Sequence, residues 1–478
     1  MKATKHNALT FLYKNLKHPV STSIFDSEYY SNNLVVAPMI ATLVVYYSDE
    51  RPVPFLAKSW HNDGNLWTFD LREGIKCENG ELITADGMRK SLIRSLKWLS
   101  KDQEQPVFNK LKGYREFRKT GDGNVLGISS RENKLIFEFT EKFRSGFLEY
   151  LTMAPFGFIC EDNYNGDAWK DKTRFISSGP YRLVEFEPGS HYTLEKRKDW
   201  PLNPDYTPDR VKIRNGTVDD LKDNSTSFIL ETSDKPKVIP KGFTMVRQMP
   251  GTLMTLSIST GKNRIFDDLD LRRIFSNKVK EKFKDRDLSD FSFNAADFFY
   301  FNQVSELAAL PTPSKAIKKP GNVIKIRSVP KPVDSMTALV EDTLRGAFED
   351  LDWPYEIFNS KDLSWEDFTD TKTYDIRRVG AEIGGGFEGW IADMLFCSKL
   401  GPKFADPSGR ICALAKEYEM TELPIQQTID RFNKYIHEDS ALIPLFHVGG
   451  QYLMSSDIDT NSLSSLITRV RFDEIKFK

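Results

Sequence analysis

The sequence predicts an α/β protein with more than one lobe. Its 478 residues exceed what one hydrophobic core usually organises, so two or three lobes are expected. Residues 323–328 and 355–358 have strand-like composition, and between them residues 335–351 carry apolar side chains at helical spacing. A connection of this length predicts a parallel strand pair joined by a helix, which is the basic unit of an α/β lobe.

The rest of the chain is organised around residues 52–99, which combine two strands and a helix. Ala57–Trp60 and Leu66–Arg72 are predicted strands, and the turn residues Asn62–Asn65 between them predict a hairpin. Thr84 is the expected N-cap of a helix whose apolar residues then recur on one face. None of these residues suggests catalysis, so the stretch is interpreted as scaffold.

The net charge and the length of the apolar runs argue against two classes of protein, nucleic-acid-binding proteins and proteins with a membrane-spanning helix. The net charge of −1 argues against a nucleic-acid-binding protein, because such proteins usually carry a basic excess. The longest apolar run, Leu34–Tyr47, contains Pro38 and is shorter than the roughly 20 residues that a membrane-spanning helix needs. We expect it to form a buried helix followed by a strand.

Residue spacing gives no sign of a metal site, a cofactor or a catalytic residue. The four cysteines, Cys77, Cys160, Cys397 and Cys412, lack C-x-x-C spacing, and the six histidines are scattered. Cys397 and Cys412 fall in one predicted lobe, where a disulfide and two buried thiols are equally compatible with the sequence. No G-x-S-x-G nucleophile elbow occurs. Only the ordinary abundance of carboxylates favours an enzyme, so we predict that the protein is not one.

Short motifs follow one another along nearly the whole chain: Pro54–Trp60, Phe69–Gly74, Asn79-Gly80, Thr84-Ala85, Ile176–Leu183, Lys262–Phe275 and Ala441–Phe446. In this order they resemble the family 5 extracellular solute-binding proteins, the oligopeptide-, dipeptide- and nickel-binding group that feeds ABC importers. Three positions depart from the family pattern. Cys77 stands where an aromatic residue is usual, Asn79 replaces Asp, and Gly87 replaces an Asp of the helix.

The resemblance implies a type II periplasmic-binding-protein-like fold that is bilobal with an extra lobe, with mixed sheets flanked by helices. Lobe I is expected to be discontinuous, whereas lobe II is a small insertion and lobe III is an α/β lobe that closes on lobe I. The expected boundaries are 1–50, 173–260 and 441–478 for lobe I, 51–172 for lobe II and 261–440 for lobe III.

A glycine-rich segment after a predicted strand is the candidate ligand site. Gly384–Gly389 formally fits G-x-G-x-x-G, but Trp390–Phe396 is too short for the helix of a dinucleotide-binding unit. The resemblance instead places this loop at the ligand cleft, although the family's W-x-x-D-Y-x-D-P motif is not intact here. The expected ligand-contacting residues are Glu382, Gly384, Gly385, Gly386, Phe387, Trp390 and Asp393.

The function implied by the resemblance is that of an extracytoplasmic substrate-binding protein of an ABC-type importer. Such a protein captures a small solute, here a peptide or peptide-like one, in an interlobe cleft by hinge closure. We expect a monomer that docks on an ABC permease in the membrane, binds no nucleic acid and is periplasmic or otherwise extracytoplasmic. No secretory signal follows Met1, so we expect that a signal was removed. The missing signal also motivates an alternative, the ligand-sensing domain of a cytoplasmic regulator with the same fold.

Overall fold

The computed structural model describes most of the chain in segments. They are residues 8–13, 35–46, 52–99, 106–142, 146–166, 168–171, 173–202, 204, 206–222, 226–232, 238–247, 252–261, 264–284, 286, 293–296, 319–328, 335–359, 372–382, 392–397, 404–420, 425–448, 451–462 and 471–478. Contacts divide the chain into two units, Met1–Met249 with Gly450–Lys478, and Pro250–Gly449. The chain therefore passes twice between the units, and each unit is described by itself. The division into three lobes remains a prediction.

The first unit contains a seven-stranded sheet with the order β10-β11-β12-β1-β13-β21-β14. Its strands are β1 (Ala8–Tyr13), β10 (Tyr181–Glu187), β11 (His191–Lys196), β12 (Arg210–Asn215), β13 (Ser227–Thr232), β14 (Phe243–Arg247) and β21 (Gln451–Ser455). The first strand of the chain, β1, pairs in parallel with both β12 and β13. Its buried side chains, such as Phe11, join a core that also includes Tyr192, Ile213 and Met454. Strands from both ends of the chain therefore belong to the same sheet.

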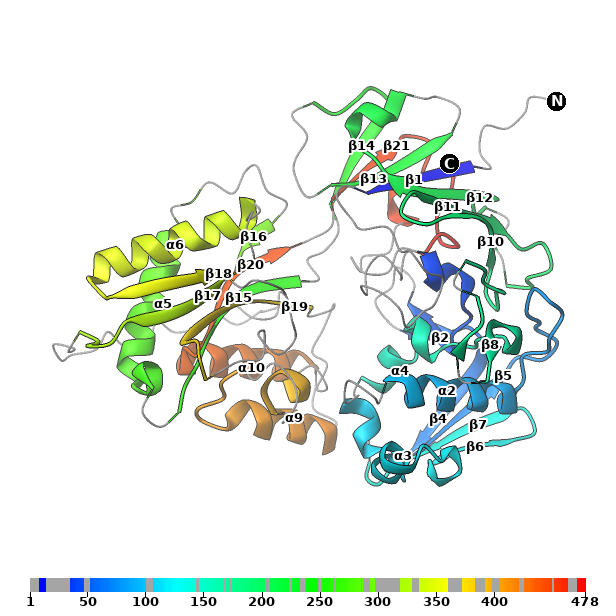
Figure 1. The fold of residues 1–478 in the computed structure, drawn as a ribbon, viewed down its shortest axis with the longest axis horizontal. Coiled ribbons are helices and arrows are strands. Elements are labelled where there is room, and N and C mark those ends of the chain that lie inside the picture. Colours follow the sequence, from blue (N-terminus) through cyan, green and yellow to red (C-terminus); the bar gives the residue numbers. More distant parts are fainter. Residues whose placement is uncertain are drawn as a thin grey trace. The chain divides into compact units, whose positions relative to one another are not determined.

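A smaller sheet in the same unit has the order β4-β5-β7-β6 (Figure 1). Its strands and accompanying helices are β4 (Ala57–Asp63), β5 (Leu66–Leu71), β6 (Ile128–Arg131), β7 (Lys134–Glu138), α2 (Ala85–Leu99), α3 (Tyr114–Thr120) and α4 (Phe147–Tyr150). The predicted hairpin and helix of residues 52–99 are confirmed. The backbone N–H of Gly87 donates to Thr84 Oγ1 at 3.0 Å, so Thr84 caps α2 as expected.

Short elements complete the first unit. They are β2 (Val44–Tyr46), β3 (Pro52–Pro54), β8 (Tyr164–Asn165), β9 (Ala168–Trp169), η1 (Ala37–Met39), η2 (Pro106–Lys110), η3 (Gly123–Val125), η4 (Ala154–Phe156), η5 (Glu161–Asn163), η6 (Val218–Lys222) and η9 (Thr460–Ser462). In the apolar run at Leu34–Tyr47, the described residues are α-helical at 35–36, continue through the 3-10 turn η1 and reach the strand β2, in the expected order of a helix followed by a strand. Pro38 lies inside η1 and lacks the N–H that a longer helix would use.

The second unit is a six-stranded mixed sheet with the order β16-β20-β15-β19-β17-β18. Its elements are β15 (Thr252–Ile258), β16 (Phe293–Ala295), β17 (Ile324–Ser328), β18 (Tyr355–Asn359), β19 (Ile376–Glu382), β20 (Leu442–Val448), η7 (Ile265–Asp267), α5 (Leu269–Lys284), α6 (Ser335–Leu351), the π-helical turn η8 (Asp393–Cys397), α9 (Arg410–Met420) and α10 (Ile425–Asp439). The predicted parallel pair is confirmed, because β17 pairs in parallel with β18 across α6.

Helices cover both faces of this second sheet (Figure 1). The helices α5 and α6 pack on one face through a core that includes Phe275, Leu344 and Ile326. The helices α9 and α10 pack on the other face, where Phe432 and Val379 belong to a second core. The unit is therefore an α/β layer structure in which the buried sheet lies between two helical layers.

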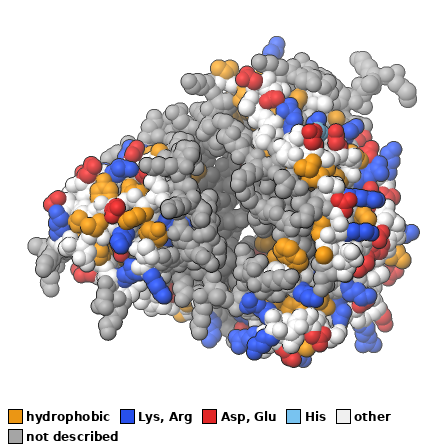
Figure 2. Space-filling view, viewed as in Figure 1, with side chains coloured by type: hydrophobic (Ala, Val, Ile, Leu, Met, Phe, Trp, Pro, Cys, Tyr) orange, Lys and Arg blue, Asp and Glu red, His pale blue; other side chains and the backbone are white. Residues whose placement is uncertain are grey.

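The visible surface of each unit carries interspersed charges. In Figure 2 the blue side chains of Lys and Arg alternate with the red ones of Asp and Glu over the described surface. This distribution fits the net charge of −1. Among the described helices, none combines the length and the apolar content required to cross a membrane.

Candidate functional site

The ligand site predicted from the sequence begins at the end of β19. Glu382 is the last residue of this strand and pairs in register with Thr252, the first residue of β15. Gly384, Gly385, Gly386, Phe387 and Trp390 lie outside the described residues. Asp393 is the first residue of the π-helical turn η8. The predicted ligand contacts of all seven residues remain predictions.

The edge of the sheet at which Glu382 lies has a polar character. The parallel strands β17, β18 and β19 end here, at Ser328, Asn359 and Glu382. The hydroxyl of Ser328 donates to the carboxylate of Glu341 on α6, and Asn359 Nδ2 lies 3.4 Å from the same carboxylate. Open α/β sheets bind ligands outside the carboxyl ends of their strands. The topology therefore brings Glu382 to the edge where a ligand site is expected.

A disulfide anchors the segment that follows the glycine-rich stretch. Cys397, at the end of η8, is bonded to Cys412 of α9, with 5.5 Å between the two Cα atoms. The sequence was equally compatible with a disulfide and with two buried thiols at these positions, and the structure has the disulfide. The bond ties residues next to the predicted ligand loop to a helix of the core.

A second disulfide joins Cys77 to Cys160, which are 83 residues apart in the sequence. Sequence reasoning did not predict this pair. The available signal was that Cys77 replaces the aromatic residue of the family motif, and a buried covalent link now occupies that position. All four cysteines are therefore paired.

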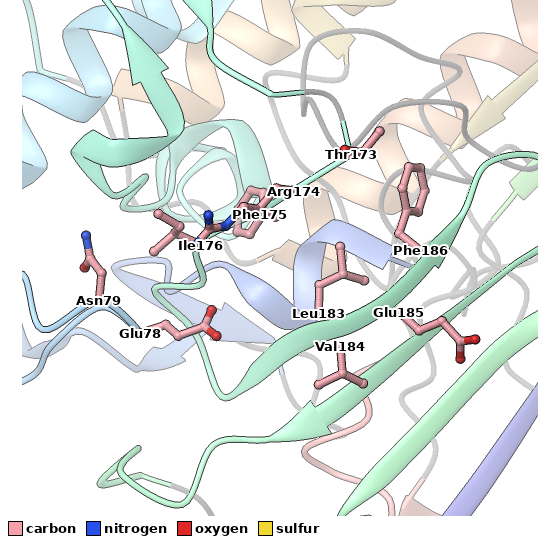
Figure 3. Close-up of a pocket in the computed structure, with 10 residues that line it drawn as sticks. All are labelled: Glu78, Asn79, Thr173, Arg174, Phe175, Ile176, Leu183, Val184, Glu185 and Phe186. Atoms are coloured by element: carbon pink, nitrogen blue, oxygen red, sulfur yellow. The ribbon is translucent and has the colours of Figure 1, made fainter.

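The first unit contains a pocket of about 450 Å³ that sequence reasoning missed (Figure 3). Its lining consists of Glu78, Asn79, Thr173, Arg174, Phe175, Ile176, Leu183, Val184, Glu185 and Phe186. The segment 173–176 forms one wall and the edge strand β10 forms the other, while Glu78 and Asn79 lie together at one end. A bulge at Val184 lets Leu183 and Phe186 project to the same side, toward the segment 173–176.

The polar groups of this pocket are already held by neighbours. Glu185 accepts a hydrogen bond from Thr193 Oγ1 at 2.9 Å, and its Oε1 lies 3.1 Å from His191 Nε2. These two contacts, that of Thr193 first, hold the pKa of Glu185 below its usual range. At the other end, Glu78 Oε2 accepts from the backbone N–H of Ser177 at 3.3 Å. The carboxylates of Glu78 and Glu185 are thus held by neighbours, and the lining also includes the basic residue Arg174.

A buried arginine positions the turns that bound the pocket. The guanidinium of Arg197 donates to the carbonyl oxygens of Lys76 at 2.8 Å, Gly179 at 3.1 Å and Ser177 at 3.3 Å. Its side chain is 2% exposed and pairs with Asp199 at 2.7 Å. At Gly179 a Cβ atom would lie 2.8 Å from the backbone of Met39, so glycine is required there. Arg197 thus links the turn before Glu78 to the turn after Ile176.

The fold defines a class of protein. The structure is similar over 98% of its length to NikA from Brucella suis in complex with Fe(III)-EDTA, with a TM-score of 0.75, 15% identity and 100% of that chain covered. It is also similar to OppA of Burkholderia pseudomallei, with a TM-score of 0.74, 15% identity and 99% of both chains covered. The predicted α/β fold of the type II periplasmic binding proteins is therefore confirmed.

The family resemblance is confirmed as well. Residues 51–276 match the model of "Bacterial extracellular solute-binding proteins, family 5 Middle". The chain is 25% identical over 261 residues to the nickel-binding periplasmic protein of Escherichia coli (strain K12), a match that covers 51% of this chain and 47% of that protein. It is 23% identical over 174 residues to the dipeptide-binding protein DppE of Bacillus subtilis (strain 168), with 34% of this chain and 31% of that protein covered. The matches thus span half or less of these relatives.

Proposed function

We propose that this protein is the extracytoplasmic substrate-binding component of an ABC-type importer and captures a peptide or peptide-like solute. The observation that carries the proposal is the match of residues 51–276 to the family 5 solute-binding proteins. The names of the two curated relatives support it, because both are binding proteins and neither is named as an enzyme or a regulator.

Capture is proposed to occur by hinge closure. Two α/β units that are joined by only two crossings of the chain, at residues 249–250 and 449–450, can rotate as bodies about a few connecting residues. An extended peptide can be held largely through its main chain, which gives affinity while tolerating different side chains. The closed form then docks on a membrane permease, and the protein acts as a monomer.

The test combines a search for the cargo with a measurement of closure. Native mass spectrometry of the purified protein is expected to reveal a co-purified solute, and calorimetry with short peptides and with Ni²⁺ separates the two ligand classes. With the tightest ligand, small-angle scattering should show a smaller radius of gyration. A tightly bound ligand that leaves the scattering unchanged would refute closure, whereas an absence of any peptide-like cargo and of peptide binding would refute the proposed function.

A double substitution tests the predicted ligand loop. Glu382→Ala together with Trp390→Ala is expected to weaken binding of the identified solute by at least about tenfold, because a desolvated polar or aromatic ligand contact is typically worth more than 1 kcal/mol. The control is Glu356→Ala, which removes an exposed carboxylate from β18 of the same sheet. Equal calorimetric affinities of the double variant and the control would mean that the solute binds elsewhere.

A further inference from the structure

Three potential metal ligands converge at the turn formed by residues 77–81 of the first unit. One ligand atom each from Cys77, Glu81 and Cys160 lies within 4.8 Å of the other two. Cys77 is 1% exposed and Cys160 is 0% exposed, and Glu81 is half-buried. The two sulfur atoms are joined as a disulfide, so the carboxylate lies next to a covalent bond that can be opened by reduction.

The backbone holds these three residues together independently of the sulfur–sulfur bond. Residues 77–81 form a tight turn in which the N–H of Cys77 donates to the carbonyl of Glu81 at 2.8 Å. The carboxylate of Glu81 accepts from the backbone N–H of Glu161, the residue after Cys160, at 2.8 Å. In addition, Asn79 Nδ2 donates to Asp162 at 2.8 Å. The segments that carry the two cysteines therefore remain linked when the disulfide is reduced.

The chemistry of the three side chains fits a cation. The Glu81 carboxylate lies within 4.8 Å of both sulfur atoms, and its charged neighbours are the acidic Glu161 and Asp162 and the basic Arg94, which pairs with Glu161. Thiolate and carboxylate are both established ligands of Zn²⁺.

We propose that Cys77, Cys160 and Glu81 form a binding site for a thiophilic divalent cation such as Zn²⁺ when the disulfide is reduced. A dithiol reductant is oxidised to its own disulfide and delivers two electrons and two protons to the Cys77–Cys160 bond. The cation then binds the two sulfur atoms as thiolates and releases the two thiol protons to solvent. Three protein ligands leave one tetrahedral position for water.

The proposed site keeps the turn cross-linked in either redox state. The turn carries Glu78 and Asn79, which close one end of the pocket in Figure 3. In the oxidised protein the disulfide anchors this turn, and in the reduced protein the metal ion does so. The inference does not depend on the identity of the transported solute, so its test and that of the proposed function can fail separately.

The experiment titrates Zn²⁺ into the full chain before and after reduction by a dithiol, with the reductant removed under argon. Calorimetry is expected to show one additional equivalent of bound Zn²⁺ in the reduced protein, and Co²⁺ should give thiolate-to-metal charge-transfer absorption. Cys77→Ser should abolish the binding of this additional equivalent of Zn²⁺, although the variant retains Cys397 and Cys412. Glu81→Gln should weaken it by at least about tenfold, whereas Glu73→Gln, which alters a nearby exposed carboxylate, should leave it unchanged.

A second readout uses the wild-type sequence alone. Zn²⁺ is expected to protect Cys77 and Cys160 of the reduced protein from alkylation, as mapped by mass spectrometry, to a greater extent than Cys397 and Cys412. Circular dichroism of each preparation establishes that it is folded. The proposal is overturned if reduced wild type binds no more Zn²⁺ than reduced Cys77→Ser, if the oxidised protein binds the same equivalent, or if the two cysteines are alkylated equally with and without Zn²⁺.

Discussion

Phe147→Ala is expected to lower the free energy of unfolding of the first unit by about 3–5 kcal/mol, the usual range for truncating a buried aromatic side chain. Phe147 begins α4 and is fully buried. Its ring centre lies 4.9 Å from that of Phe137, 5.0 Å from Phe139 and 5.4 Å from Trp67, in each case edge to face. Removing it opens a cavity at the centre of an aromatic cluster that joins α4 to the four-stranded sheet.

Urea denaturation monitored by tryptophan fluorescence measures this loss. Phe147→Leu retains much of the apolar volume and should cost less than Phe147→Ala, in keeping with the milder effect of apolar replacements that largely fill the site. Leu82→Ala is the surface control, because Leu82 is 53% exposed, and its effect should stay within about 0.5 kcal/mol. An alanine variant at position 147 as stable as this control would show that the cluster does not depend on the Phe147 ring.

Arg197→Ala should also destabilise the first unit by about 3–5 kcal/mol, the cost typical of breaking a buried charged network. The substitution leaves the carbonyl oxygens of Lys76, Ser177 and Gly179 without the guanidinium that now donates to them. Arg197→Lys restores the charge but not the planar set of donors, so it should recover only part of the stability. Chemical denaturation of the three proteins gives the comparison.

The matched control is Arg182→Ala. Arg182 also pairs with a carboxylate, that of Glu195 at 2.5 Å, but the two side chains are 46% and 42% exposed. Exposed ion pairs contribute at most about 1 kcal/mol, so this variant should remain close to wild type. If the two alanine variants lose equal stability, the buried carbonyl contacts of Arg197 do not contribute as we infer.

The pH dependence of stability provides a further check on the same network. The hydrogen bond from Arg197 is the largest cause of a lowered pKa of Asp199. A carboxyl group with a lowered pKa in the folded state stabilises the protein above its unfolded pKa, and this contribution is lost as the pH falls through the folded pKa. The effect is small because the Asp199 side chain is 63% exposed. In Arg197→Ala this acid-sensitive part of the stability should become smaller, while the backbone hydrogen bond and Arg182 still favour the ionised form of Asp199.

Features that depend on neighbours along the chain could be predicted from the sequence. Alternation in Leu66–Arg72 predicted β5, and the capping residue Thr84 predicted the start of α2. The helical spacing around residues 335–351 predicted α6 and the parallel pair β17–β18. The order of the short motifs predicted the family. Each motif could be recognised because it consists of neighbouring residues that form a local turn or a helix cap. The predicted ligand residues came from the resemblance and await the binding experiments.

Local pattern predicted the order of elements in one apolar run but not where its helical part ends. The run Leu34–Tyr47 suggested a helix followed by a strand, and its described residues are α-helical at 35–36, form the 3-10 turn η1 and then reach β2. Hydrophobicity indicated correctly that the run is buried. Its conformation was decided by the lost N–H of Pro38 and by pairing of β2 with β3. Burial is thus easier to predict than the backbone geometry that achieves it.

The sequence by itself determined the local elements, their order and the family to which the motifs point, because each depends on residues a few positions apart. Only the tertiary structure decided which distant residues meet. The Cys77–Cys160 bond spans 83 residues, and the pocket combines residues near positions 78, 174 and 185. Such contacts carry no local periodicity, since they depend on which strand order and turn placement bury the most apolar surface while satisfying buried polar groups such as Arg197.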